Sequence, residues 1–101
     1  MFEYRIYESV YNDIIIGKKT IEFRLLNDKS NSIKNGDIIR FRVVNSNKFA
    51  DVEVINKYIY DNLDDLYNHK NVLNNILDCN KEELTDMFYE IFAAIRITLL
   101  T

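Results

Sequence analysis

The residues of this chain best suited to chemistry lie in one short segment, where polar and charged side chains alternate with apolar ones. The segment runs from Gly17 to Arg24 and reads Gly-Lys-Lys-Thr-Ile-Glu-Phe-Arg. Side chains of a strand alternate between the two faces of a sheet, so Thr20, Glu22 and Arg24 are predicted on one face. A carboxylate accepts hydrogen bonds or a proton, and arginine offers a planar fork for a phosphate or a carboxylate. We therefore expect a polar site beside a sheet.

Lys19 and Glu22 each have two interpretations. Lys19 would be a nucleophile if burial or the neighbouring cations Lys18 and Arg24 lowered its pKa, and otherwise it is a solvated lysine that holds a phosphate. Glu22 would act as a general base, or would accept a hydrogen bond from the exocyclic amine of a base such as cytosine. Its plainer role is an ion pair with Arg24 on the same strand, which contributes little if exposed.

Two further kinds of side chain are candidates for ligand contacts. Arg40 and Arg42 lie on one predicted strand face and would contact a nucleic-acid backbone, or else form a solvated face of the sheet. Tyr58 and Tyr60 share another strand face and would stack on a base, or else pack across strands. The candidate ligand-binding residues are therefore Lys18, Lys19, Thr20, Glu22, Arg24, Arg40 and Tyr58.

Composition limits the class of protein. The chain has 101 residues, 48% of them apolar, which fits a single domain over residues 1–101 with a small core. The net charge of −3 argues against a broad phosphate-gripping surface, although basic residues gather in the first half and acidic ones in the second. The single cysteine, Cys79, excludes an internal disulfide, and His69 stands alone, so we expect no metal and no cofactor.

The location of the protein is predicted from what the sequence lacks. We find no run of about 18 apolar residues that would span a bilayer. The first residues, Met-Phe-Glu-Tyr-Arg, do not have the basic and then apolar order of a signal peptide. We therefore expect a cytoplasmic protein with no membrane partner.

Hydrophobic periodicity predicts the elements that must position these side chains. The only two glycines, Gly17 and Gly36, are expected to end a helix and to form a tight turn after Asn35. Ser9 is a candidate N-cap, and the polar run 27–32 is predicted to be a loop. A change of parity near residues 54–55 indicates a bulge. We expect strands over residues 2–6, 19–25, 37–44, 48–60 and 93–99, and helical segments over residues 10–16, 63–67, 72–77 and 80–91.

This order of elements predicts a small α+β fold. Five strands must bury their apolar faces with few helices to cover them. A closed or nearly closed barrel of about five to six strands, with short helices packed around it, is the economical arrangement.

Two segments at this spacing resemble a known family. Gly-Lys-Lys-Thr-Ile-Glu-Phe-Arg-Leu at residues 17–25, followed by Ile-Lys-Asn-Gly-Asp-Ile-Ile-Arg-Phe at residues 33–41, is similar to the ASCH domain (activating signal cointegrator homology), a branch of the PUA-like β-barrels. The match is strongest over residues 11–44. The resemblance implies a PUA-like barrel with a cleft that is lined by the Gly-Lys-Lys-Thr segment and receives RNA or a nucleotide-like ligand.

The resemblance also implies a second function. Some small bacterial members of that family are amidohydrolases that remove an acyl group from a modified cytidine such as N4-acetylcytidine, using a lysine, a nearby threonine and a later acid. The lysine matches Lys19, whereas Glu22 stands in the place of the threonine. Candidates for the later acid are Asp78, Glu82 and Glu83. RNA or nucleotide binding is thus the leading hypothesis, and an amidohydrolase with Lys19 as the reactive amine and Glu22 in proton transfer is the alternative.

Overall fold

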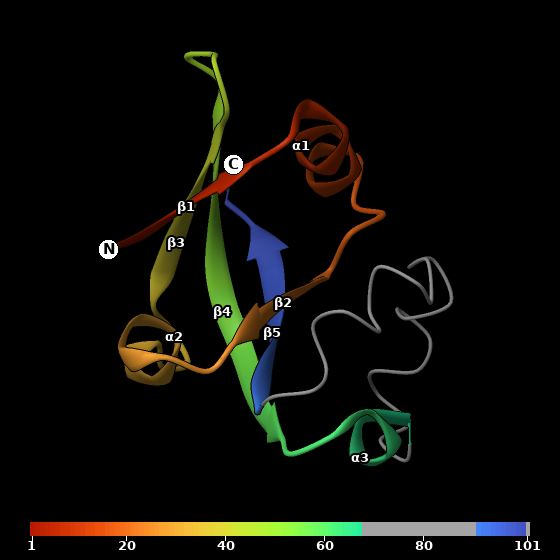
Figure 1. Cartoon of the computed structure of the whole chain (residues 1–101). Coiled ribbons are helices and arrows are strands. Elements are labelled where there is room, and N and C mark those ends of the chain that lie inside the picture. The colour runs from red at the N-terminus through yellow and green to blue at the C-terminus, as the bar shows by residue number, and fades with distance from the viewer. Residues whose placement is uncertain (68–90, 101) are drawn as a thin grey trace.

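Five strands form one sheet, and short helices lie beside it (Figure 1). The computed structural model describes residues 1–67 and 91–100. In chain order the elements are β1 (Phe2–Ile6), α1 (Glu8–Ile15), β2 (Ile21–Leu25), α2 (Asp28–Ser32), β3 (Ile38–Val43), β4 (Phe49–Tyr60), α3 (Leu63–Tyr67) and β5 (Phe92–Leu99). The strand order is β1-β3-β4-β5-β2, with β1 parallel to β3 and each other neighbouring pair antiparallel.

The sheet curls until its two edge strands, β1 and β2, approach each other (Figure 1). The guanidinium carbon of Arg24 on β2 lies 4.1 Å from the ring centroid of Tyr4 on β1. The ammonium of Lys29 on α2 also donates a hydrogen bond to the backbone carbonyl of Glu3 on β1. The predicted mixed α+β fold is thus confirmed as a curled, half-barrel sheet. Among the strands that the structure describes, side chains rather than a hydrogen-bonded ladder join β1 to β2.

The core fills the inside of the curl. Alternate residues of β3 and β4 are buried there, as the sequence periodicity predicted. The register of β4 against β5 shifts between Val54 and Asn56, which confirms the predicted bulge and bends the long strand. The side chains of the core cluster are Tyr4, Ile6, Ile14, Ile33, Ile39, Phe41, Val43, Ala50, Val52, Val54, Ala93, Ile95 and Ile97.

Helix α1 ends as predicted but begins differently. Gly17 follows the helix with a φ of +79°, a left-handed conformation that an L side chain rarely adopts. The predicted N-cap, Ser9, is wrong, because Tyr7 occupies the cap position and provides no side-chain hydrogen bond. The carboxylate of Glu8 in the first turn instead lies at the positive end of the helix dipole.

Residues 27–32, predicted to be a loop, contain helix α2. Asn27 and Ser30 form a reciprocal capping box, in which each side chain accepts a hydrogen bond of 2.9 Å from the other residue's backbone N–H. At the other end, the Lys57 ammonium donates to the carbonyls of Ser30 and Asn31, at 3.0 and 2.9 Å. The polar composition that suggested a loop therefore serves to cap a short helix.

Several predictions lie outside the described residues. These are the helical segments over residues 72–77 and 80–91, His69, Cys79 and the three candidate late acids. In the part of the chain that the structure does describe, no helix is long and apolar enough to cross a membrane.

Candidate functional site

Strand β2 turns its polar side chains toward the inside of the curl. Glu22 pairs with Ile95, and Arg24 pairs with Ala93, across the β2–β5 ladder. Directly opposite residues share a face of the sheet, and both partners belong to the core cluster. The alternation of Thr20, Glu22 and Arg24 expected from the sequence therefore places charged groups against the core rather than toward solvent.

Glu22 is a buried carboxylate held between two cations. Its side chain is 9% exposed, with Oε1 lying 3.5 Å from the Lys19 ammonium and Oε2 lying 3.3 Å from Nη2 of Arg24. A buried carboxylate needs polar partners to offset the loss of water, and these two contacts supply them inside the curl. Each oxygen keeps further acceptor capacity, because an ionised carboxyl offers about four lone-pair directions.

Tyr4 completes this cluster, although the sequence analysis did not single it out. Its ring stacks on Phe41 at 6.3 Å between centroids and is also contacted by the cations of Arg24 and Lys29, at 4.1 and 4.0 Å from the centroid. The residue is only 9% exposed. The sequence does offer one indication of its burial, because Tyr4 alternates with the apolar Phe2 and Ile6 along β1.

Two polar atoms of the cluster have no hydrogen-bond partner among the described residues. The Tyr4 hydroxyl and Nε of Arg24 are both buried and make no hydrogen bond with any group in residues 1–67 and 91–100. Burial raises the pKa of the Tyr4 hydroxyl, the charge of Arg24 opposes that rise, and the charge of Glu22 adds to it. The hydroxyl is therefore a neutral donor at physiological pH. We call Tyr4, Lys19, Glu22 and Arg24 the seam site, since they lie where β1 and β2 approach.

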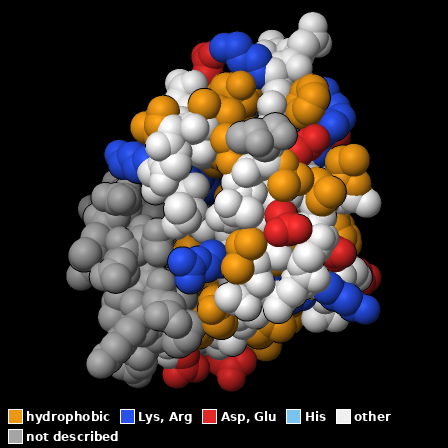
Figure 2. Space-filling view, turned by 180° about the vertical axis from the view of Figure 1, so that it is seen from behind, with side chains coloured by type: hydrophobic (Ala, Val, Ile, Leu, Met, Phe, Trp, Pro, Cys, Tyr) orange, Lys and Arg blue, Asp and Glu red, His pale blue; other side chains and the backbone are white. Residues whose placement is uncertain are grey.

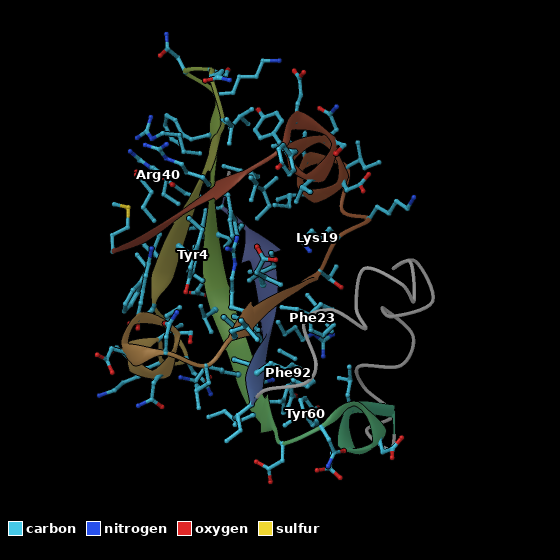
Figure 3. All side chains as sticks on the ribbon, viewed as in Figure 1. Tyr4, Lys19, Phe23, Arg40, Tyr60 and Phe92 are labelled. Atoms are coloured by element: carbon cyan, nitrogen blue, oxygen red, sulfur yellow. The ribbon has the colours of Figure 1, made fainter. Side chains whose placement is uncertain are left out.

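A pocket of about 190 Å³ lies beside the seam site. It is formed by the end of α1, the link into β2 and the last residues of β5. Lys19 both lines the pocket and forms the ion pair with Glu22. Figure 3 shows Lys19 on this link and Tyr4 within the curl. An engineered cavity of about 150 Å³ holds benzene, so the pocket has room for a small ring or a short acyl group. Its lining residues are Ile14, Ile15, Gly17, Lys19, Thr20, Ile97, Thr98 and Leu99.

Arg40, a predicted ligand contact, is not part of the seam site. It lies on the outer face of β3, where its Nε and Nη2 donate to the two oxygens of Asp51 at 2.8 and 3.0 Å. Its guanidinium carbon also lies 4.0 Å from the Phe49 ring centroid. The hydrogen bond from Arg40 lowers the pKa of Asp51. Both donors of this fork are thus engaged within the protein.

Tyr58 also lies apart from the seam site. It is 6.5 Å from Tyr60 between ring centroids, and Tyr60 stacks on Phe92 at 5.5 Å. Burial raises the pKa of Tyr60 to about 12. Figure 3 shows Phe23, Tyr60 and Phe92 together near α3, away from Tyr4. The aromatic group is therefore on the other face of β2 and β5.

Lys18, another predicted ligand contact, is exposed on the link before β2.

Three arginines gather on the outer face of β1 and β3, where Arg5 lies opposite Arg42 in the ladder and Arg40 follows on the same face. On the face seen in Figure 2, Lys and Arg side chains stand singly among apolar and acidic ones and form no continuous stripe. A second pocket, of about 230 Å³, lies at the β3–β4 hairpin between Arg5 and Arg42. Arg42 is paired there with Glu3 at 3.2 Å. Within the described residues, no three His, Cys, Asp or Glu side chains are grouped as metal ligands would be.

Comparisons with known proteins identify the fold and no function. No family model and no curated protein matches the chain. The crystal structure of hypothetical protein PH0355 is similar at a TM-score of 0.65 and 24% identity, covering 98% of this chain and 98% of that one. The solution NMR structure of protein PF0455 from Pyrococcus furiosus is similar at a TM-score of 0.60 and 24% identity, covering 98% of this chain and 96% of that one. The curled sheet is thus shared along nearly the whole chain.

Proposed function

We propose that this protein binds RNA or a nucleotide-like small molecule at the seam site. The observation that carries the proposal is the buried carboxylate of Glu22, which is paired with Lys19 and Arg24. Beside it lie two buried polar atoms that have no hydrogen-bond partner among the described residues. An unsatisfied buried polar group costs about 1–3 kcal/mol, which is a large penalty for a domain with a small core. Such groups are retained where something else completes their hydrogen bonds.

The chemistry of the cluster suits a nucleotide-like ligand. Glu22 accepts a hydrogen bond from an amine such as the one that cytosine presents, while Arg24 and Tyr4 donate to a carbonyl or ring nitrogen. The similarity of residues 17–25 and 33–41 to the ASCH domain supports the same conclusion. The net charge of −3, and the pairing of the outer-face arginines Arg40 and Arg42 with carboxylates, favour a short or single-nucleotide ligand over a long RNA strand.

Ligand-observed NMR on the purified protein tests this proposal. The panel consists of the four nucleosides, their monophosphates, N4-acetylcytidine and short single-stranded RNAs. We expect Arg24→Ala to weaken binding at least about tenfold, because it removes the guanidinium donors and leaves Lys19 as the remaining cation beside Glu22 among the described residues. Arg96→Ala is the matched control, since Arg96 is an exposed arginine of β5 that belongs neither to the seam site nor to the predicted ligand contacts. Unchanged affinity in a folded Arg24→Ala protein would contradict the proposal.

One observation favours an amidohydrolase as the second candidate. The Lys19 ammonium lies 3.5 Å from Glu22, a separation that closes to a hydrogen bond with a small movement, and Lys19 also borders the 190 Å³ pocket. An N-acyl nucleoside would place its acyl group in that pocket, and hydrolysis would yield the nucleoside and a carboxylic acid. Release of acetate from N4-acetylcytidine, followed by NMR, measures this activity. Lys19→Ala should abolish it, whereas Lys34→Ala, at an exposed lysine that does not line the pocket, should not. Near wild-type turnover by Lys19→Ala excludes Lys19 as the reactive amine.

A further inference from the structure

We infer that the seam site recognises an uncharged edge that carries both a hydrogen-bond donor and an acceptor, as a nucleobase does, and that the Tyr4 hydroxyl is one of its ligand contacts. The inference rests on the proposed function and narrows it, because it excludes phosphate as the group that enters the curl. It also assigns a role to Tyr4.

The seam site contains hydrogen-bond donors and acceptors that the described residues of the protein leave unused. The Lys19 ammonium and Nη2 of Arg24 each face one oxygen of Glu22. Among the buried atoms of the described residues, what remains is one N–H at Nε of Arg24, one hydroxyl on Tyr4, and the unused lone pairs of the carboxylate. The site therefore offers two donors and an acceptor at a single place.

This capacity does not match a phosphate. Arginine binds phosphate most strongly through two parallel N–H groups, and at the buried edge of Arg24 the N–H parallel to Nε belongs to Nη2, which is directed at Glu22. A phosphate on Nε would also lie beside the 9% exposed carboxylate of Glu22, where like charges repel strongly because little water screens them. An uncharged ligand avoids that repulsion.

A nucleobase edge matches the same capacity. A carbonyl oxygen or ring nitrogen would accept from Nε of Arg24 and from the Tyr4 hydroxyl, and an amine would donate to Glu22. The raised pKa of Tyr4 keeps its hydroxyl protonated and able to donate. The Tyr4 ring already contacts Phe41, Arg24 and Lys29, so recognition occurs through the edge of the base rather than by stacking on this ring.

Calorimetric titration of the full chain with three matched probes tests the inference. The probes are the nucleosides, their 5′-monophosphates and ribose 5-phosphate. We expect a nucleoside to bind about as tightly as its monophosphate, and ribose 5-phosphate to bind more than about tenfold more weakly. Tyr4→Phe should weaken nucleoside binding about five- to tenfold, the effect of one buried hydrogen bond. Tyr7→Phe, which removes a hydroxyl from a residue 76% exposed, is the control and should have no effect.

A second variant separates charge from hydrogen bonding. Arg24→Lys keeps the positive charge beside Glu22 and removes the Nε donor, so it should weaken nucleoside binding about as much as Tyr4→Phe does. If ribose 5-phosphate and the monophosphates bind while nucleosides do not, the inference is overturned and the proposed function stands. If nucleosides bind and Tyr4→Phe leaves their affinity unchanged, the role of Tyr4 is overturned. If no probe and no RNA binds, both proposals fail.

Discussion

Replacing Tyr4 by phenylalanine should stabilise the free protein. The substitution removes one oxygen and keeps the ring, so the contacts with Phe41, Arg24 and Lys29 are retained. Removing the hydroxyl breaks no hydrogen bond within the described residues and leaves no new unpaired group. The variant therefore isolates the cost of burying that one oxygen.

The expected gain follows from this accounting. Burying an unsatisfied polar group costs about 1–3 kcal/mol, and a small part of the gain is lost because cation–π attraction to phenylalanine is weaker than to tyrosine. We expect a net increase of about 1 kcal/mol in the free energy of unfolding. For a domain of this size that corresponds to a rise in Tm of about 4–8 °C.

Urea unfolding followed by far-UV circular dichroism measures the effect. The midpoint should rise for Tyr4→Phe with an unchanged m-value, and Tyr7→Phe should match the wild type. A loss of about 1 kcal/mol or more would refute the reasoning, because it would show that the hydroxyl is hydrogen-bonded in the free protein. A gain in stability together with weaker ligand binding is the signature of a residue retained for function.

Three further substitutions test the elements that surround the site. Asn27→Ala removes the capping box of α2 and should cost about 1 kcal/mol in urea unfolding, whereas alanine at the exposed Asn12 of α1 should cost little. Gly36→Ala should cost about 1–2 kcal/mol through its φ of +88° alone, since no atom lies within 4 Å of the added Cβ, and a neutral result in thermal unfolding would contradict this. Asp51→Asn tests pH dependence. The pKa of Asp51 is lowered by Arg40, so the pair stabilises the protein above the unfolded-state pKa near 4 and loses that effect as pH falls through the folded-state value. The difference in Tm between wild type and Asp51→Asn should therefore shrink below about pH 4, and a constant difference would argue against the assignment.

The individual strands could be predicted from the sequence because the pattern that specifies a strand is local. Strict alternation over residues 37–44 identified the buried face of β3, and the change of parity near Val54 identified the bulge in β4. Gly17 and Gly36, which were predicted at a helix end and a tight turn, both have a positive φ. Each of these signals depends on neighbours a few residues away.

The rest of the site depends on contacts between distant parts of the chain. Tyr4 and Arg24 meet only because the sheet curls, and no sequence pattern records how far it curls. Asn27 and Ser30 were taken for loop residues because capping residues and loop residues have the same composition. The ion pair of Arg40 with Asp51 also depends on the strand register, which the sequence pattern does not specify.

The position of β2 in the sheet has a consequence for how the protein matures. β2 carries Glu22 and Arg24, and its ladder partner is β5, the last strand of the chain. During synthesis the amino-terminal segments emerge first, so β1, β3 and β4 can pair while β2 still waits for residues 92–99. Pairing across so long a loop is slow compared with forming a hairpin. The strand that carries Glu22 and Arg24 therefore takes its place in the sheet only after residues 92–99 have been synthesised, which makes this pairing a late step of folding.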